Sequence, residues 1–367
     1  MSQRQLSLPY RMLKGFRYFI HRWVHWEYWP DWLVFVPIVP YYLYLSAKAR
    51  SLFFFSSSNP TMEYSGMAGE SKMDVYGLIP SEYLPKTILY KKGEELLKIR
   101  TWMNEEYIDY PIYMKPDKGG KGMGVEIINK WEELEKYAQE MPLDIICQEK
   151  IDFPNEVGIF YIKYPNAEHG FISGLVGKKA VKVVGDGKST LEELIINNPR
   201  FYFQKEYLFK KFNHLLENVI PRTEEVMLST IGNHARGSEF VDLTTMVDEK
   251  LERQIDSISN KIPQFYFGRY DIKYNSLAEL AEGKNFKIIE LNGAGSAPTH
   301  IYDPNFGLFN ALKVLTRHWK YLYDISVMNQ QRGIGFMSFR DGMKMIKINN
   351  EVIQQLVDYQ RKSLTSE

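Results

Sequence analysis

The sequence predicts an α+β fold. From about residue 68 onward, short apolar strands and amphipathic helices follow one another without the regular alternation that is typical of a doubly wound sheet. The length of 367 residues suggests two or three domains. Hydrophobic residues make up 44% and charged residues 25% of the chain, which is an ordinary globular balance, although aromatic residues reach 14%.

The charge balance excludes two classes of protein. The chain has 46 Lys and Arg against 45 Asp and Glu, so its formal net charge is +1. This excludes a strongly basic chain that coats nucleic acid, and also a polyacidic disordered chain. A single cysteine, Cys147, excludes an internal disulfide and a cysteine-based zinc cluster, and it favours a reducing compartment such as the cytoplasm.

The first 67 residues form a basic, aromatic region. Five cations precede the first acid, Glu27, but no apolar segment with a cleavage site follows them as in a signal peptide. The longest apolar run, residues 33–45, contains Pro37 and Pro40 and has 13 residues. A membrane-spanning helix needs about 20 apolar residues, so we expect none here.

Tryptophans recur every third residue in this region, and tyrosines follow them. On one helix this spacing predicts a slanting aromatic stripe. The favoured interpretation is that the stripe packs on the core of the protein or on a partner subunit. The alternative is peripheral membrane contact through residues 10–45, on the inner membrane face, because indole rings favour the headgroup level. The residues are Trp23, Trp26, Trp29, Trp32, Tyr41, Tyr42 and Tyr44.

A hairpin with a glycine-rich tip is predicted next. Residues 111–115 and 125–128 are typical of paired strands, and a helix over 131–140 follows. Glycine amides can approach phosphate oxygens closely, and Lys115 on the first strand would add positive charge. The pattern also fits an ordinary loose turn. The glycines are Gly119, Gly120, Gly122 and Gly124.

Further strands are predicted over 145–150 and 157–164, and two more within 171–184. Cys147 lies in the first of these and is expected in the core. The segment 185–190 is not a P-loop, since Lys182 stands where that motif needs a glycine. A helix over 191–197 follows, and Ser189 with Glu192 predicts a capping box at its start.

Two late strands place three oxygen ligands together. Strands are predicted over 267–274 and 286–292, and Glu290 and Asn292 face the same way because they lie two residues apart. With Asp271 on the preceding strand they suit Mg²⁺ that is bound together with phosphates. The alternative is a solvated strand face with a cross-strand Arg269–Glu290 pair. Helices over 308–323 and 351–362 complete the chain.

In this order, the motifs resemble the ATP-grasp ligases, in particular the D-alanine–D-alanine ligase, glutathione synthetase and cyanophycin synthetase branches. The resemblance covers residues 68–325 and implies two α+β subdomains that hold ATP between antiparallel sheets, with a flap subdomain near 90–165 and an extension over 326–367. It rests on 70–72 with 85–87, 111–124, 148–151, 155–157, 183–194, 269–271 and 290–292.

The resemblance implies a carboxylate–amine ligase that works through an acylphosphate, on small-molecule or lipid-like substrates. Two Mg²⁺ ions, or Mn²⁺ in their place, would be held by Asp271, Glu290 and Asn292, and Arg269 would be the catalytic residue. The implied ATP contacts are Lys72, Lys115, the four loop glycines, Glu149, Lys150, Ile151 and Glu156. Weaker candidates for phosphate or substrate contacts are Asn233, His234, Arg236, Ser296 and His300.

The chain departs from the family pattern at its N-terminus, where the aromatic region replaces a Rossmann-like domain, so the substrates of known members do not carry over. Two alternatives stay open: a catalytically silent nucleotide-binding scaffold, and an ATP-dependent kinase. A homo-oligomer is also compatible with the sequence.

Overall fold

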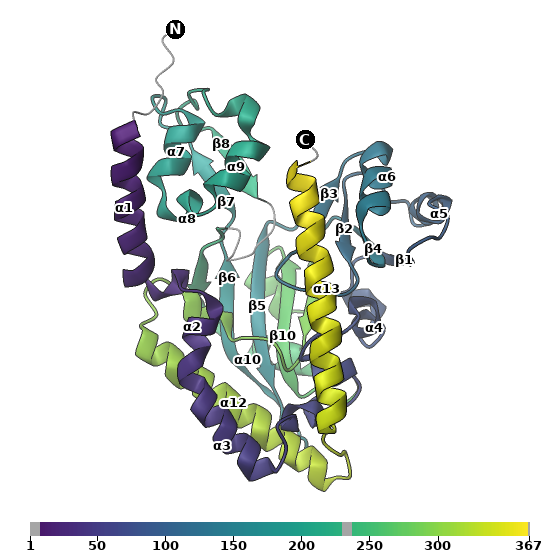
Figure 1. Cartoon of the computed structure of the whole chain (residues 1–367). Helices are drawn as coiled ribbons and strands as arrows, with labels where there is room; N and C mark the ends of the chain where they lie inside the picture. The colour runs from purple at the N-terminus through teal and green to yellow at the C-terminus, as the bar shows by residue number, and fades with distance from the viewer. Residues whose placement is uncertain (1–7, 230–236, 366–367) are drawn as a thin grey trace. The chain divides into compact units, whose positions relative to one another are not determined.

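The structure is a computed structural model, and it describes residues 8–229 and 237–365 (Figure 1). Its helices and antiparallel sheets confirm the predicted α+β class. Chain contacts define two compact units. Unit 1 comprises Met1–Pro37, Lys178–Asp242 and Ile301–Leu312, and unit 2 comprises Ile38–Gly177, Leu243–His300 and Lys313–Glu367. The boundaries predicted at residues 67 and 325 stay a prediction.

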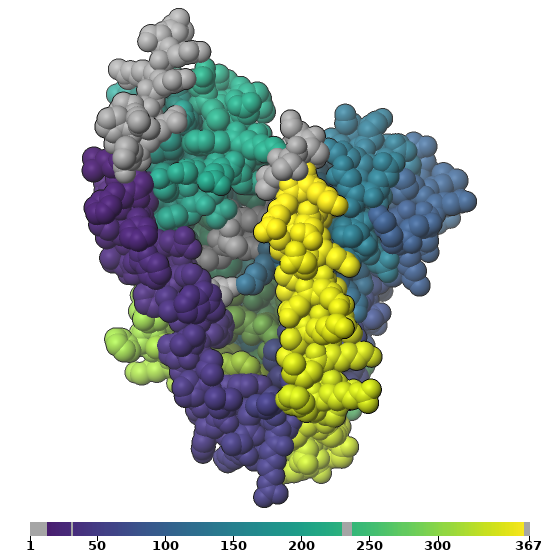
Figure 2. Space-filling model, in the orientation of Figure 1, coloured from purple at the N-terminus to yellow at the C-terminus, as the bar shows by residue number. Residues whose placement is uncertain are grey.

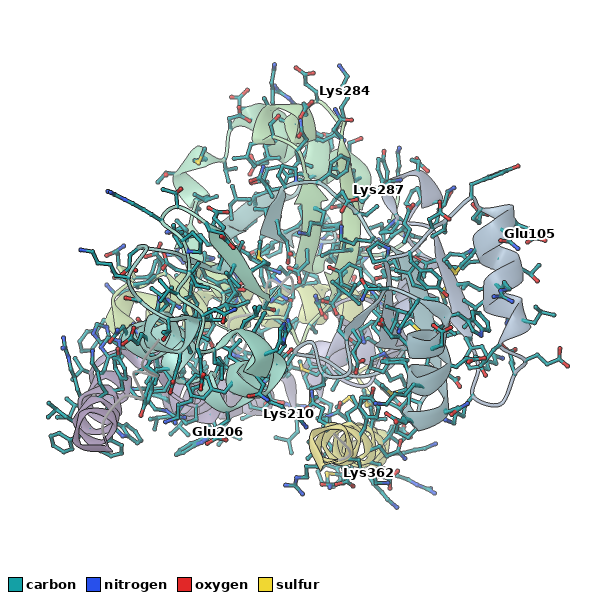
Figure 3. The ribbon with its side chains drawn as sticks, turned by 90° about the horizontal axis from the view of Figure 1, so that it is seen from above. Glu105, Glu206, Lys210, Lys284, Lys287 and Lys362 are labelled. Carbon is teal, nitrogen blue, oxygen red and sulfur yellow. The ribbon has the colours of Figure 1, made fainter. Side chains whose placement is uncertain are left out.

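The first sheet of unit 2 contains the predicted glycine hairpin. Its strand order is β1-β4-β2-β3, and every neighbouring pair is antiparallel. Helices α5 and α6 supply apolar side chains to its core, where Cys147 is fully buried, as predicted. The elements are β1 (Thr87–Tyr90), α5 (Leu97–Glu105), β2 (Ile112–Pro116), β3 (Glu126–Ile128), α6 (Trp131–Glu140) and β4 (Ile145–Glu149). Figure 3 marks Glu105 at the end of α5.

Four strands of the second sheet belong to unit 2, in the order β11-β10-β5-β6, and their neighbours are again antiparallel. Helix α10 packs on it through Leu251, Ile255 and Ile258, and the short helix α4 adds Val75 and Tyr76 to the same core. The elements are α4 (Lys72–Tyr76), β5 (Asn155–Ile162), β6 (Phe171–Lys178), α10 (Glu249–Ser259), β10 (Phe267–Tyr274), α11 (Leu277–Ala281) and β11 (Phe286–Asn292).

The C-terminal helix α13 (Phe339–Thr365) is much longer than the predicted 351–362. Its early part places Met345 in a core with Phe54, whereas Leu356 and Tyr359 belong to the core of the first sheet. The Tyr359 hydroxyl also donates to Glu126 Oε1 at 2.8 Å. The helix therefore connects the two halves of unit 2. It follows α12 (Leu308–Gln331), and Lys362 near its end is labelled in Figure 3.

The polar segment around Asn59 is fixed to the second sheet of unit 2. Asn59 is completely buried, and its side chain donates to Phe267 O at 2.8 Å and to Ser65 O at 3.1 Å. Its Oδ1 accepts from the amides of Tyr266 and Phe267 at 2.9 and 3.0 Å. Every polar atom of this amide group is therefore paired, as burial requires. The segment follows α3 (Val39–Ala49).

Unit 1 is built around a two-stranded sheet and short helices. Strands β7 and β8 pair antiparallel, and Val181, Leu191, Phe201 and Leu228 form the core between the sheet and the helices. The elements are α1 (Leu8–Val24), α2 (Asp31–Phe35), β7 (Val181–Val184), α7 (Leu191–Asn197), α8 (Pro199–Tyr202), α9 (Lys205–Lys211), β8 (Glu225–Ser229) and β9 (Phe240–Asp242).

The predicted capping box is displaced by one residue. Helix α7 has the predicted bounds, but Thr190 is its N-cap and Glu193 is the reciprocal partner, instead of Ser189 and Glu192. Ser189 is bound by the preceding turn, since its amide and hydroxyl donate to Asp186 at 2.7 Å each. The side chain that the prediction used as a cap is therefore already hydrogen-bonded.

The predicted tryptophan stripe is wrong as a single helical row. The helix α1 ends at Val24, a short 3₁₀ turn holds Trp26, and α2 begins after Pro30. Trp26 is 8% exposed and donates to Phe306 O at 3.0 Å, whereas Trp23 and Trp32 are 49% and 66% exposed. Trp26 is therefore packed inside the protein, whereas Trp23 and Trp32 are exposed to solvent.

Within the described residues, one helical stretch, Trp32–Ala49, meets the length and composition of a membrane span. Its mean hydropathy is 1.2 over 18 residues, and 22% of it is buried. The stretch combines α2, a 3₁₀ turn over Val36–Ile38 and α3, and it contains Pro37 and Pro40.

Candidate functional site

Two carboxylates of unit 2 face each other across β10 and β11. The register pairs Asp271 with Glu290 and Arg269 with Asn292, so these side chains share one face of the sheet. Gly158 on β5 lies opposite Asp271. A Cβ atom at Gly158 would approach Asp271 Oδ1 to 3.3 Å and Val176 Cγ1 to 2.8 Å. Glycine therefore leaves the room that the Asp271 carboxylate occupies.

Arg269 holds Asp271 with a two-point ion pair. Its Nε and Nη2 donate to Oδ1 and Oδ2 of Asp271 at 3.0 and 3.1 Å, and Nη1 donates to Ala297 O at 3.3 Å. Burial acts to lower the pKa of Arg269, but the carboxylates of Asp271 and Glu290 outweigh it and raise this pKa. The alternative cross-strand Arg269–Glu290 pair is therefore wrong, since Arg269 pairs with its own strand.

Lys115 is buried at the end of the glycine hairpin. Its ammonium group donates to Tyr76 Oη at 2.7 Å, Gln148 Oε1 at 3.0 Å and Ile289 O at 3.3 Å. Desolvation lowers the pKa of Lys115 to about 8, against the opposing attraction of the Glu290 carboxylate. Within the described part of the chain its three hydrogen-bond partners are uncharged, so an anionic ligand would compensate the buried charge.

Lys72 approaches the same region from the start of α4. Its ammonium group donates to Gly119 O at 2.7 Å, Asp117 O at 3.2 Å and Pro116 O at 3.3 Å. Burial lowers the pKa of Lys72, and Glu290 acts in the opposite direction. The helix start is fixed by Asp117 Oδ1, which accepts from Ser71 Oγ at 3.0 Å and the Met73 amide at 2.9 Å.

A small cavity lies beside Lys72 and Glu290. It has a volume of about 20 Å³, which is room for about one water molecule, and its lining includes Glu70, Lys72, Tyr76, Glu290 and Asn292. Glu70 Oε2 and Asn292 Nδ2 are buried and have no hydrogen-bond partner within the described part of the chain. Burial raises the pKa of Glu70. A ligand, an ion or a water molecule in this cavity would supply partners for the two atoms.

The predicted hairpin is present, since β2 and β3 pair antiparallel, and three of its loop glycines have positive φ values. Gly119, Gly122 and Gly124 have φ values of 121°, 69° and 69°. A Cβ atom at Gly119 would come within 2.5 Å of Leu356 Cδ1 on α13, whereas one at Gly120 would meet nothing within 4 Å. The two adjacent glycines therefore differ sharply in their surroundings, and the loop is held by the C-terminal helix.

The residues expected to contact adenine and ribose lie on β4, β5 and the connection between them. Glu149 Oε1 accepts from the Lys86 amide at 2.7 Å, and Lys150 pairs with Asp152. Ile151 follows in the connection, and Glu156 lies 3.7 Å from Lys273 Nζ across β10. In this structure the two carboxylates already bind cationic or amide groups of the protein.

Three of the weaker candidates, Asn233, His234 and Arg236, lie outside the described residues. Ser296 Oγ donates to Gly293 O at 2.6 Å, and this bond stabilises the turn after β11. His300 is 4% exposed, and a side chain at Gly174 would overlap its ring. The structure therefore places His300 in a packed environment. Sequence reasoning assigned no role to Glu70, Tyr76 or Gln148, although Glu70 and Gln148 lie in motifs that carried the resemblance.

The donor set fits a hard divalent cation. Within the described ranges, no group of three or more His, Cys, Asp or Glu side chains is placed to hold a metal ion. Two carboxylates with the Asn292 amide oxygen would be an incomplete shell that phosphate oxygens and water complete, as Mg²⁺ prefers. Asp271 would have to share its oxygens between Arg269 and the ion.

Comparisons with known proteins give a similarity of fold only. No protein-family model and no curated protein matches the chain. Among solved structures, a bifunctional glutathione synthetase from Pasteurella multocida is 16% identical with a TM-score of 0.37, covering 66% of this chain and 35% of that one. D-alanine–D-alanine ligase from Bacillus anthracis is 12% identical with a TM-score of 0.41, covering 73% and 70%.

A third structure, the VanG D-Ala:D-Ser ligase from Enterococcus faecalis, is 15% identical with a TM-score of 0.38 and covers 72% of this chain and 62% of that one. The chain thus spans about a third of the glutathione synthetase. At TM-scores below 0.5, these similarities establish neither the family nor the activity of this chain.

Proposed function

We propose that this protein is an ATP-dependent ligase of the ATP-grasp type, which joins a carboxylate to an amine or another nucleophile. One observation carries the proposal: the Lys115 ammonium is buried and donates only to uncharged oxygens among the described residues, beside the glycine loop. The partly buried Lys72 and Arg269 add positive charge to the same site. A buried cation is costly unless an anion compensates it. A triphosphate with its divalent cation is an anion of the right charge and chemistry.

Each part of the site would hold one part of ATP. Lys72 and Lys115 would bind phosphate oxygens, and the amides of the loop from Gly119 to Gly124 would add neutral donors. Glu149, Lys150 and Ile151 would contact adenine, and Glu156 would accept from the ribose hydroxyls. Asp271, Glu290 and Asn292 would hold Mg²⁺, which neutralises phosphate charge when it is bound.

The reaction follows from this placement. The carboxylate oxygen of the substrate attacks the γ-phosphorus, the bond to the β,γ-bridging oxygen breaks, and ADP leaves with the electron pair. The amine then attacks the carbonyl carbon of the acylphosphate, inorganic phosphate leaves, and the amine nitrogen loses its proton. Arg269 would stabilise charge on the transferring phosphoryl group and on the tetrahedral intermediate. Closure of the glycine loop would exclude water, which otherwise hydrolyses the acylphosphate.

One observation favours a second candidate, a nucleotide-binding scaffold without turnover. The Arg269 guanidinium already neutralises Asp271 at two points, so this carboxylate is less available to a metal ion. A scaffold would bind ATP and release no product. A kinase would release ADP but would not form an activated carboxylate.

The experiment measures ADP and phosphate release with panels of carboxylates and amines, with hydroxylamine as a trap. A hydroxamate product supports the ligase, because only an activated carboxylate gives one. The test variant is Glu290→Gln, and the matched control is Glu282→Gln, an exposed pair partner of Lys284. Turnover that persists in Glu290→Gln would refute the metal assignment. ATP binding without ADP release would identify the scaffold, and ADP release without hydroxamate would identify the kinase.

A further inference from the structure

Helix α1 of unit 1 exposes a continuous apolar face. Six large apolar side chains of this helix are between 47% and 70% exposed. At 100° per residue they fall within an arc of roughly 140° on one side of the helix. Single exposed apolar residues are ordinary, but a contiguous row of this length marks a docking surface. The six residues, here called the α1 apolar face, are Leu13, Phe16, Phe19, Ile20, Trp23 and Val24.

The other side of α1 packs on unit 1. Tyr18 is 5% exposed, and its ring lies 4.5 Å from that of Tyr202 and 6.4 Å from that of Phe203. A Cβ atom at Gly15 would lie 3.1 Å from the Tyr202 hydroxyl. The helix is thus attached by this side, and the α1 apolar face lies on the side that does not pack. Figure 2 shows the helix in purple at the surface.

The charge of α1 selects the class of partner. The helix carries Lys14, Arg17 and Arg22 and contains no Asp or Glu. The first acid after it, Glu27, is buried. An apolar face flanked by cations and free of acids is complementary to a bilayer with anionic headgroups. A second copy of the chain is less complementary, because it would bring two sets of cations together.

The aromatic content agrees with the same partner. Phe16 and Phe19 supply large apolar surface, and Trp23 at the last turn has the ring that favours the level of lipid headgroups. Trp32, which follows on α2, is also exposed by two thirds.

We propose that α1 is an interfacial helix that attaches this protein to anionic membranes, with the α1 apolar face inserted at the level of the headgroups. The helix lies in the plane of the membrane surface and does not span it. The cations Arg17 and Arg22 contact lipid phosphates. The attachment needs no nucleotide, so it is independent of the ligase proposal.

The test is flotation of the full-length protein with vesicles of phosphatidylcholine alone or with 30% phosphatidylglycerol, without ATP. We expect flotation with the anionic vesicles, at least tenfold weaker partitioning into the neutral ones, and release when NaCl is raised from 50 to 500 mM. The double variant Phe16→Glu/Phe19→Glu should lose at least tenfold in partitioning. The matched control, Phe309→Glu, removes an 81% exposed phenylalanine of α12 and should float as the wild type does.

Thermal unfolding of the variants shows whether weaker flotation comes from the changed α1 apolar face or from an unfolded protein. Because both substituted phenylalanines are exposed, the unfolding midpoint should not change. The double variant Arg17→Gln/Arg22→Gln is a second test. It should partition more weakly into anionic vesicles at low salt, and the partitioning that remains at high salt should be unchanged. Full-length protein that stays at the bottom of the gradient at low salt would overturn the proposal. Equal flotation of Phe16→Glu/Phe19→Glu would do so too. A dimer in light scattering that this double variant dissociates would assign the face to a second copy instead.

Discussion

Replacing Lys115 by methionine separates the stability of the site from its function. Lys115 is 8% exposed and donates three hydrogen bonds, so its replacement removes those bonds and also the cost of a buried charge. Burial lowers its pKa to about 8 from 10.5. That difference means that the charged form costs the folded protein about 3 kcal/mol at pH 7.

The loss of three hydrogen bonds, at about 1 kcal/mol each, offsets the relief of that cost. We therefore expect Lys115→Met to change the free energy of unfolding by less than about 1 kcal/mol at pH 7. The pH dependence is sharper. Between pH 8 and 10.5 the unfolded chain binds more protons than the folded one at Lys115, so the stability of the wild type rises with pH in that window.

Urea unfolding of both proteins at pH 7.0 and 9.5 measures this difference. The wild type should gain roughly 2 kcal/mol relative to Lys115→Met over this range, while the variant should lose nucleotide binding at both pH values. Leu89→Met, a nearby partly buried apolar position, controls for the new side chain. A variant that is destabilised by several kcal/mol at pH 7 and whose difference from the wild type does not change with pH would refute the reasoning.

Three further predictions concern the site and its support. Glu290→Gln should reduce Mg²⁺-dependent ATP turnover at least a hundredfold, measured by ADP release, because a carboxylate of the proposed metal site is lost. Gly119→Ala should lower the free energy of unfolding by about 1–3 kcal/mol, because its φ is 121° and the new methyl group overlaps Leu356. Gly120→Ala should leave the free energy of unfolding nearly unchanged, because the new methyl group meets no atom. Addition of Leu356→Ala should recover part of the Gly119→Ala loss in a double-mutant cycle, and a purely additive result would contradict the contact. Asn59→Ala should cost about 2–4 kcal/mol in urea unfolding, since it leaves the amides of Tyr266 and Phe267 and the carbonyl of Phe267 without their partner, and a neutral result would contradict this pairing.

Local sequence patterns predicted most elements of unit 2 well. The bounds of α6, β10 and β11 agree with the structure, because alternation and turn residues act over a few neighbouring positions. The length of α13 was underestimated, since its first half is stabilised by contacts with distant residues such as Phe53. The tryptophan stripe was wrong because Pro30 and a 3₁₀ turn interrupt the helix that the spacing assumed.

In the candidate site, too, local features could be predicted from the sequence, whereas contacts between distant segments could not. Facing carboxylates on β10 and β11 follow directly from spacing within each strand, so Asp271 and Glu290 could be paired from the sequence. The contact of Lys115 with Tyr76 and Ile289 depends on segments far apart in the chain, and no local pattern contains it. The Arg269–Asp271 pair was equally hidden, because a cross-strand partner was the simpler expectation.

The most direct test of the central claim is calorimetric titration of the protein with Mg²⁺ and a non-hydrolysable ATP analogue at pH 8, in two buffers of different ionisation enthalpy. If the triphosphate binds against Lys115, whose pKa is lowered by burial to about 8, binding should be accompanied by proton uptake at this pH, and Lys115→Met should abolish both the proton uptake and the binding. Absence of binding heat in the wild type, or unchanged affinity in the variant, would contradict the account.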